Sequence, residues 1–429
     1  MEGKLFIDNC FALSEGVLRK SSVLISDGRI EAIGIPDPEG VTAVDARGGL
    51  ISYGFADIHV HFREPGNPEK ETILSGSMAA ARGGYTTVCA MPNLDPVPDS
   101  PEHLEEELKI IRKDAVIQVL PYCSITKGRK GLELVDIPAL KPFCAAFSDD
   151  GSGVQDEEVM RKAFRLAAEN GCIIAAHCED NSLLAGGYIH DGRWCAAHGH
   201  KGICSESEWG QIARDLALVR ETGCGYHVCH ISTKESVALI RRAKAEGLDV
   251  TCETAPHYLL LDDAMLQEDG RFKMNPPIRS AEDRDALLEG LRDGTVDMIA
   301  TDHAPHSAEE KSRGLAGSLM GIVGLETAFP LLYTYLVLPG KLTLPRLMEL
   351  MCVKPRRRFR LGESMRENDP ADFTVFDLNA AYSVDPDSFL SMGRSTPFAG
   401  WPVRGKCMMT VANGRMAYCD PGLAKELGL

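Results

Sequence analysis

Eight short apolar runs that end in polar residues alternate with helical stretches, and this alternation constrains the fold more than any other feature of the chain. Helical periodicity separates most of the runs, as in residues 102–113, 156–170, 206–222, 234–246 and 281–292. The runs end at residues 59–61, 91–93, 124–126, 148–150, 177–179, 230–232, 253–255 and 301–303. Eight strand-then-helix units predict an α/β fold, a (β/α)8 TIM-like barrel.

The two chain ends carry a different pattern, that of short hairpins. Asp27-Gly28 separates two apolar runs near the N-terminus, and Asn413-Gly414 does the same near the C-terminus. Such pairs favour tight two-residue turns, in which both positions need a positive φ. Neither end has enough strands to cover a hydrophobic face alone. We therefore expect a small β domain built from both ends, residues 1–53 plus 366–429, and a barrel formed by residues 54–365.

Histidines and aspartates collect at the predicted carboxyl ends of the strands, where barrel enzymes carry their active sites. His59 and His61 are two residues apart on one strand, so both side chains should point into the barrel mouth. An HxH pair alone is a weak signal. With His177, His230 and aspartates after the fourth and eighth strands, the set becomes one that binds zinc and leaves a position open for water.

Two further histidines and two cysteines lie next to this set. His303 follows Asp302 directly and should face away from the mouth, whereas His257 lies beyond its strand end and is a weaker candidate ligand. Cys178 and Cys229 each neighbour a candidate ligand, so strand alternation predicts that both thiols point outward, between strand and helix.

The charge balance and the cysteines exclude several classes of protein. Lys plus Arg is 46 and Asp plus Glu is 62, so the net charge of −16 disfavours binding to nucleic acid or to an anionic membrane. A basic run at residues 354–359, KPRRRF, is predicted to be a solvated helix face. The longest apolar run, residues 328–340, is shorter than the ~20 residues that cross a bilayer. The 14 cysteines form no CxxC pair, which indicates buried free thiols in a reducing, cytoplasmic compartment.

Several longer motifs resemble one known family. They are DIHVHFREPG (residues 57–66), GGYTTV (83–88), MPN (91–93), FSDDG (147–151), AHCEDN (176–181), HVCHISTKES (227–236), KMNPP (273–277) and TDHAPH (301–306). In this order they resemble the bacterial class I dihydroorotases of the amidohydrolase superfamily. The resemblance runs from about residue 28 to about residue 405.

The resemblance implies a metal centre with one or two zinc ions. The implied ligands of one zinc are His59 and His61. Those of a second zinc, if two are bound, are His177 and His230. Asp150 would bridge the two positions. In many relatives the bridge is a carboxylated lysine, but here the nearest lysine, Lys141, precedes the strand, so the chain resembles the aspartate-bridged type. Asp149 is the competing bridge, because alternation points only one of the two aspartates inward.

The resemblance also implies a reaction, the zinc-dependent, reversible cyclisation of N-carbamoyl-L-aspartate to L-dihydroorotate in de novo pyrimidine biosynthesis. Asp302, also counted among the metal ligands, would accept a proton as the ring opens and pass it to the departing nitrogen. Arg63 offers a planar guanidinium that suits the substrate carboxylate. The implied substrate-binding residues are Arg63, Asn93, Asn275, His306 and the backbone at Gly321.

Residues 307–320, SAEEKSRGLAGSLM, are predicted to form a lid that orders over the substrate. Two alternative functions remain open. One is that of another cyclic amidohydrolase, a hydantoinase or an allantoinase, and the other is that of a non-catalytic barrel paralogue. The number of zinc ions is also open, as are a homodimer and an association with aspartate transcarbamoylase.

Overall fold

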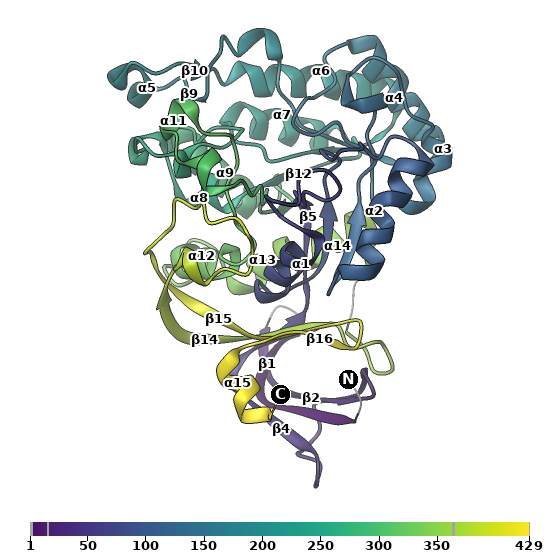
Figure 1. The fold of residues 1–429 in the computed structure, drawn as a ribbon, viewed down its shortest axis with the longest axis vertical. Coiled ribbons are helices and arrows are strands. Elements are labelled where there is room, and N and C mark those ends of the chain that lie inside the picture. Colours follow the sequence, from purple (N-terminus) through teal and green to yellow (C-terminus); the bar gives the residue numbers. More distant parts are fainter. Residues whose placement is uncertain (1–2, 15–16, 363–364, 429) are drawn as a thin grey trace.

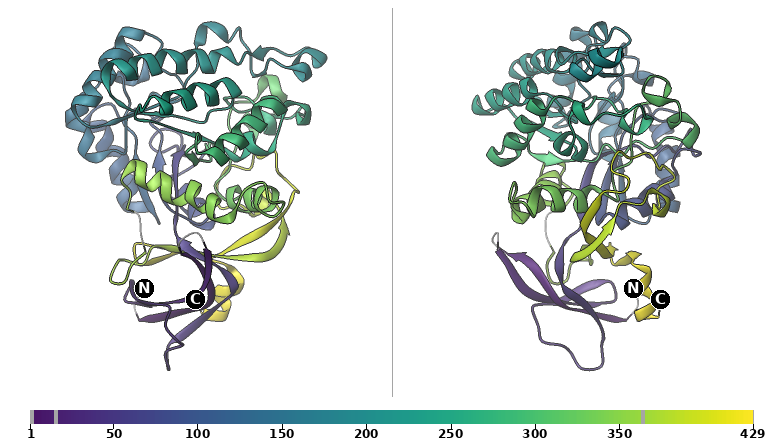
Figure 2. Two further views of the ribbon diagram at one scale, coloured as in Figure 1. Left: turned by 180° about the vertical axis from the view of Figure 1, so that it is seen from behind. Right: turned by 90° about the vertical axis from the view of Figure 1, so that its left-hand side faces the viewer.

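The computed structural model describes residues 3–14, 17–362 and 365–428. Figure 1 shows a barrel ringed by helices and, below it, an open sheet that contains both chain ends. Figure 2 shows the same arrangement from behind and from the side, with the N- and C-terminal segments close together in each view. The predicted fold class, a (β/α)8 barrel with a small β domain built from both ends, is confirmed.

The barrel consists of two short parallel sheets joined by isolated bridges. One sheet has the order β5 (Phe55–Val60), β6 (Tyr85–Ala90), β7 (Gln118–Pro121). The other contains β8 (Ile173–Ala176), β11 (Gly225–Val228), β12 (Val250–Thr254) and β13 (Met298–Ile299). Phe147 bridges Cys123 on one side and Ile174 on the other, so a single residue takes the place of the fourth strand. A bridge between Val60 and His303 closes the ring.

The predicted helices form where periodicity and capping residues place them. They are α2 (Pro101–Asp114), α4 (Glu157–Glu169), α6 (Glu206–Thr222), α7 (Lys234–Ala245) and α9 (Ala281–Asp293). All but α6 begin after a side chain that accepts a backbone N–H of the first turn, namely Ser100, Asp156, Thr233 and Ser280. These caps satisfy N–H groups that have no partner within the helix.

A seven-stranded sheet forms the other part of the molecule, in the order β16-β15-β14-β4-β1-β2-β3. Its N-terminal strands are β1 (Lys4–Ser14), β2 (Val17–Ser26), β3 (Arg29–Ile33) and β4 (Thr42–Tyr53). Its C-terminal strands are β14 (Phe373–Ser383), β15 (Pro402–Ala412) and β16 (Arg415–Cys419). The antiparallel pairing of β4 with β14 joins the two groups, with Tyr53 opposite Phe373.

Both predicted hairpin turns are confirmed, and they pack against each other. Asp27 and Gly28 have φ angles of 48° and 76°, and Asn413 and Gly414 have 47° and 75°. A Cβ on Gly28 would lie 2.8 Å from the carbonyl oxygen of Gly414, and a Cβ on Gly414 would lie 2.5 Å from that of Gly28. Both positions therefore need glycine, because of the backbone conformation and because of the close approach of the turns.

Below the mouth, the barrel interior contains an apolar cluster beside the buried polar residues His227 and Glu253. Its buried cluster comprises Ile58, Cys89, Met91, Tyr122, Ala146, Ala175, Cys229, Met298, Ala300 and Phe359. The prediction that the Cys229 thiol points outward is wrong, because Cys229 belongs to this interior cluster. A φ of 33° at His230 interrupts the alternation, so the His230 side chain also points to the mouth. Cys178 does point outward, with its thiol 3.2 Å from the Tyr226 hydroxyl.

The basic run at residues 354–359 forms α14 (Lys354–Phe359) and is not a solvated helix face. Arg356 is only 1% exposed. Its guanidinium donates to the Gly54 carbonyl oxygen at 2.9 Å and to Thr86 Oγ1 at 2.7 Å, and lies 4.0 Å from the centre of the Tyr53 ring. The prediction fails at Arg356 because carbonyl oxygens and an aromatic ring replace water around this cation.

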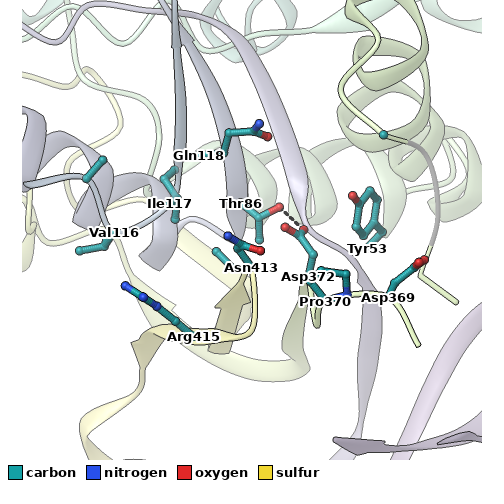
Figure 3. Close-up of a pocket in the computed structure, with 13 residues that line it drawn as sticks. Tyr53, Thr86, Val116, Ile117, Gln118, Asp369, Pro370, Asp372, Asn413 and Arg415 are labelled. Atoms are coloured by element: carbon teal, nitrogen blue, oxygen red, sulfur yellow. Dashed lines mark hydrogen bonds between the residues drawn. The ribbon is translucent and has the colours of Figure 1, made fainter. Parts of the chain in front are cut away.

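A cavity of about 690 Å³ lies at this junction, between the barrel floor and the sheet. Figure 3 shows its lining, with Thr86 and Asp372 joined by a hydrogen bond near Tyr53 and with Asn413 and Arg415 beside them. The lining of this cavity is therefore partly polar. It lies at the opposite end of the barrel from the histidines.

The cysteines agree with the prediction of free thiols. All 14 are free, and ten of them, including Cys89, Cys178 and Cys229, are buried. In the described ranges of the chain, we find no helix with the length and apolar character that a membrane crossing requires.

Candidate metal centre

Six side chains that the sequence singled out lie together at the barrel mouth. They come from β5 and from the turns that follow Phe147, β8, β11 and β13. In chain order they are His59, His61, Asp150, His177, His230 and Asp302. All six are between 0% and 7% exposed. Burial of so many imidazoles and carboxylates is costly unless they pair with one another or bind a metal ion.

Asp150 lies at the centre of this cluster, close to all four imidazoles. Its Oδ1 is 3.4 Å from Nε2 of both His59 and His230, and 3.7 Å from Nδ1 of His177. Its Oδ2 is 3.6 Å from Nε2 of His61. Burial alone would raise the pKa of Asp150, but the charge of His59 and the nearby His230 imidazole hold it well below its usual range. The carboxylate is therefore ionised and can act as a ligand.

Asp149, the alternative bridge, accepts hydrogen bonds from a neighbouring turn. Its Oδ1 accepts the backbone N–H groups of Ile125 at 2.8 Å and Thr126 at 3.1 Å. These bonds hold the turn that follows the third barrel strand. The geometry therefore favours Asp150 as the carboxylate shared by the imidazoles.

Asp302 lies on the β5 side of the cluster. Its Oδ1 is 3.1 Å from Nε2 of His61 and 3.6 Å from Nε2 of His59. Both Asp302 and His230 have a positive φ, 47° and 33° respectively. Residues with a Cβ rarely adopt this conformation, and where they do the strain tends to serve a functional site.

The cluster contains polar atoms that nothing in the described chain satisfies. His59 Nε2 and Asp150 Oδ1 are buried and have no hydrogen-bond partner among the described residues. Nδ1 of His177 and Nε2 of His230 are hydrogen-bonded to each other at 2.9 Å, and the two nitrogens are close enough together to bind one cation instead. Among the described residues, three trios have ligand atoms within 4.8 Å of one another. They are His59 with His61 and Asp302, His59 with Asp150 and His230, and His59 with Cys229 and Glu253. These residues fit a divalent metal ion.

The cluster opens into a cavity of about 240 Å³. All five residues that the sequence predicted to bind substrate line this cavity, namely Arg63, Asn93, Asn275, His306 and Gly321. Five of the six clustered side chains line it too, namely His61, Asp150, His177, His230 and Asp302. A molecule in the cavity would therefore contact the candidate metal ligands directly.

Arg63 and Asn93 line this cavity and make different hydrogen bonds. Arg63 donates from Nε to the Pro305 carbonyl oxygen at 3.3 Å. Burial lowers the pKa of Arg63 to about 10, so the guanidinium stays charged at neutral pH. Asn93 accepts a hydrogen bond from His61 Nδ1 at 2.8 Å and donates to Asp150 Oδ2 at 3.2 Å. This link between two candidate ligands was not predicted from the sequence.

Asn275 and His306 are oriented by neighbouring polar groups. Asn275 donates to Glu179 Oε2 at 2.7 Å, and His306 donates from Nε2 to the Met320 carbonyl oxygen at 2.8 Å. Burial lowers the pKa of His306 to about 3, and the nearby Arg63 contributes to this shift, so its imidazole is neutral.

Gly321 has a φ of 137°, and a Cβ there would lie 2.6 Å from the Ala304 carbonyl oxygen, so this position needs glycine. Its N–H donates to the Lys273 carbonyl oxygen at 3.0 Å. The predicted contact of its backbone with a substrate carboxylate would therefore require this N–H to change partner.

Comparison with known proteins identifies the family. The Dihydro-orotase-like family model matches residues 48–236. The dihydroorotase of Geobacillus sp. (strain WCH70) is 50% identical over 409 residues, which cover 94% of this chain and 96% of that protein. The dihydroorotase of Listeria monocytogenes is 51% identical over 411 residues, with the same coverage of 94% and 96%. The chain belongs to the dihydroorotase family.

Solved structures share the fold of this dihydroorotase-family chain. An L-hydantoinase from Arthrobacter aurescens has a TM-score of 0.85 at 28% identity and covers 97% of this chain and 96% of its own. A D-hydantoinase has a TM-score of 0.84 at 21% identity, with coverage of 97% and 95%, which shows the fold alone.

His303 and His257 are the two histidines whose roles the sequence left less certain. His303 faces away from the mouth, as predicted, since its Nε2 is 3.2 Å from Glu71 Oε2 and its Nδ1 accepts the Gly324 N–H at 3.2 Å. His257 is 2% exposed, and burial lowers its pKa to about 4. It is absent from the described residues that line the cavity.

Two carboxylates that were not assigned from the sequence lie beside the candidate ligand imidazoles and are not among the described residues that line the cavity. Glu253 Oε1 is 2.6 Å from His59 Nδ1, and Glu179 Oε1 is 3.9 Å from His177 Nε2. Both belong to polar strand ends that the sequence had located, so their position was a usable signal.

The predicted lid, residues 307–320, forms α10 (Ala308–Lys311) and α11 (Gly314–Gly317) beside the cavity. Lys311 is 7% exposed and donates from Nζ to the carbonyl oxygens of Lys273 at 3.0 Å and Leu319 at 2.7 Å. Leu315 is buried, and Glu310 pairs with Lys70 at 2.9 Å. These contacts hold the segment against the KMNPP run; its movement as a lid remains a prediction.

Proposed function

We propose that this chain catalyses the reversible cyclisation of N-carbamoyl-L-aspartate to L-dihydroorotate, the dihydroorotase step of de novo pyrimidine biosynthesis. The observation that carries the proposal is Asp150 in contact with four imidazoles, beside a cavity that Arg63 lines. Relatives that are 50% and 51% identical and carry the name dihydroorotase support the same reaction.

We propose zinc as the metal, one or two ions per chain. The residues that would hold it are His59, His61 and Asp302 on one side, His177 and His230 on the other, and Asp150 between them. When bound, zinc supplies Lewis acidity, which makes water a stronger acid and a carbonyl carbon a better electrophile. The nitrogen-rich donor set supports zinc over magnesium, which prefers oxygen ligands.

Asp302 is the proposed proton carrier. As the ring opens, its carboxylate accepts a proton from the attacking water and gives it to the departing ring nitrogen. Burial raises the pKa of Asp302, but the hydrogen bond from His61 and the charge of His59 bring it below its ordinary value, so the carboxylate begins as a base. The same group works in reverse when the ring closes.

Arg63 is the proposed partner of the substrate carboxylate. Its charged, planar guanidinium can bind a carboxylate through two parallel hydrogen bonds. His306 and Gly321 line the same cavity and would complete the carboxylate site, and Asn275 would contact the ring. N-carbamoyl-L-aspartate has two carboxylates and dihydroorotate one, so closing the ring consumes a proton and acid favours synthesis.

The direct test follows the ultraviolet absorbance of dihydroorotate while purified protein opens the ring, with and without a chelator. We expect ring opening that stops when the metal is removed and returns when zinc is added. Turnover of hydantoin but not of dihydroorotate would favour the hydantoinase alternative. Folded protein that contains no metal and has no activity would favour the non-catalytic paralogue.

We also propose a cellular location, binding partners and a domain division for this enzyme. The free thiols support a cytoplasmic location, and the relatives named dihydroorotase support a small-molecule substrate. A homodimer and an association with aspartate transcarbamoylase rest on family membership, and light scattering of the chain with and without that enzyme tests both. The division into residues 1–53 plus 366–429 and 54–365 is supported by the seven-stranded sheet, and limited proteolysis tests its boundaries.

A further inference from the structure

Glu253 is a buried carboxylate that joins candidate metal ligands from two strands. It lies on β12 and is 0% exposed. Its Oε1 is 2.6 Å from Nδ1 of His59 and accepts the backbone N–H of His230 at 3.3 Å. Its Oε2 is 3.0 Å from Nε2 of His227, whose Nδ1 is 2.9 Å from Thr251 Oγ1. One side chain therefore spans β5, β11 and β12.

The first contact determines which nitrogen of His59 faces the cluster. A carboxylate oxygen can only accept, so Nδ1 carries a proton and Nε2 is the nitrogen that faces the cluster and is placed to bind a metal ion. That Nε2 is the buried atom without a partner in the described chain, 3.4 Å from Asp150 Oδ1. A carboxylate behind a ligand imidazole also makes the imidazole a stronger electron donor.

The second contact supports the backbone of His230 where it is strained. The φ of 33° at His230 turns its imidazole to the mouth. A positive φ at a residue with a Cβ is unfavourable, and the hydrogen bond from the His230 N–H to Glu253 helps to stabilise it. Glu253 is absent from the described residues that line the cavity, so it contacts neither the substrate nor the reacting atoms.

We propose that Glu253 is a positioning residue of the metal centre, which orients His59 from one strand and fixes the backbone of His230 on another, and thereby strengthens metal binding. The inference rests on the proposed function, because it requires the imidazoles to hold a metal ion. It is a role for a residue outside the ligand set and outside the cavity.

The variant Glu253→Gln tests this role because it keeps the shape of the side chain and removes its charge. The matched control is Glu208→Gln. Glu208 is also buried, 3% exposed, but its hydrogen bonds come from Ser232, Thr233 and Ser236, none of which is a candidate ligand. Both variants should be somewhat less stable to urea than the wild-type chain, since each loses a buried charged acceptor.

Metal affinity separates the two variants. Competition between the protein and a chromophoric chelator for Zn²⁺ and for Co²⁺, at constant pH, gives the affinity without any substrate. We expect Glu253→Gln to bind roughly 10- to 100-fold more weakly than wild type, while Glu208→Gln stays within about twofold. The visible spectrum of bound Co²⁺ should change in Glu253→Gln alone, because that spectrum reports ligand geometry.

Wild-type affinity and an unchanged Co²⁺ spectrum in folded Glu253→Gln would overturn the inference, and so would an equal loss of affinity in Glu208→Gln. Wild-type protein that binds neither ion would instead overturn the proposed metal centre, which is a distinguishable result. If Glu253→Gln does not fold, Glu253→Asp keeps the charge and shortens the reach by one methylene. A loss of affinity in that variant supports the inference, and wild-type affinity contradicts it.

Discussion

At the scale of single residues, the proposed chemistry depends most on Asp302, the carboxylate 3.1 Å from His61 Nε2 at the cavity wall. Asp302→Asn keeps the size of the side chain and removes its ability to accept a proton. We expect kcat for ring opening to fall by roughly 10²- to 10⁴-fold, as the loss of a general base does elsewhere. Steady-state kinetics with a metal determination on the same sample would check this, and a loss below tenfold would contradict the role.

Arg63 should affect substrate binding more than chemistry. Arg63→Lys keeps a charge but loses the planar pair of donors, so we expect KM for dihydroorotate to rise roughly 10- to 100-fold with a smaller change in kcat. Dihydrouracil has the same ring without the carboxylate and is the control ligand. Its inhibition constant should not change in the variant, and an equal rise for both compounds would contradict a carboxylate contact.

The candidate site could be predicted where its residues are close in sequence to a strand end. It could be predicted less well where the backbone conformation determines which way a side chain points. Periodicity and the family motifs suffice to locate His59, His61 and Asp150 in the sequence. Neither could show that His230 has a φ of 33°, which is why the outward orientation predicted for Cys229 was wrong. Contacts such as that of Asn93 with His61 join residues 32 positions apart and arise from the folded barrel.

At the scale of elements, the helices were predictable because their signals are local. Ser100, Asp156 and Ser280 each precede an amphipathic stretch and accept a backbone N–H of the first turn. The fourth barrel strand was different, because Phe147 makes only isolated bridges to its two neighbours. An apolar run predicts that a segment is part of the barrel wall. The number of hydrogen bonds that it makes to the neighbouring strands depends on those strands and cannot be predicted from the run itself.

The segment at residues 307–320 should become harder to open as the pH rises. Burial, with a further contribution from Lys273, lowers the pKa of Lys311 from 10.5 to about 7. The closed segment therefore loses this proton near pH 7, whereas the open one keeps it to about pH 10. The closed state binds fewer protons between these values, so its stability increases by at most about 1.4 kcal/mol per pH unit.

Hydrogen exchange of peptides from residues 307–320 between pH 7 and 9.5, corrected for the intrinsic exchange rate, measures this dependence. In Lys311→Met the slope should vanish, while peptides from α2 should show no such slope in either protein. Faster opening of the wild-type segment at higher pH would contradict the prediction. Stronger protection in the presence of dihydroorotate would support its movement as a lid, and equal protection with and without it would oppose that.

At the scale of the whole molecule, Arg356 holds the barrel floor to the β domain. It donates to the Gly54 carbonyl oxygen and to Thr86, and its guanidinium lies 3.6 Å from Asp372 at the start of β14. Arg356→Met would remove the guanidinium donors from the Gly54 carbonyl oxygen and Thr86 and the buried cation beside Asp372, so we expect the free energy of unfolding to fall by roughly 3 kcal/mol. Urea denaturation measures the loss.

The control for Arg356 is Arg112→Met, since the side chain of Arg112 is 57% exposed and pairs with Glu105 on the surface. Such pairs contribute at most about 1 kcal/mol, so this variant should unfold close to the wild-type midpoint. Equal losses in the two variants would show that the buried position of Arg356 has no special importance. The charge of the KPRRRF run is visible in the sequence, but the Gly54 carbonyl oxygen that accepts from Arg356 is 302 positions away.

The sheet order also dictates when this chain can finish folding during synthesis. β4 is paired on one side by β1 and on the other by β14, which the ribosome makes only after the entire barrel. At 5–20 residues per second, that interval is roughly 15–65 s. Throughout it, the N-terminal hairpin presents an unsatisfied strand edge to the cell. We therefore expect this edge of β4 to be open to wrong pairing until its C-terminal partner arrives.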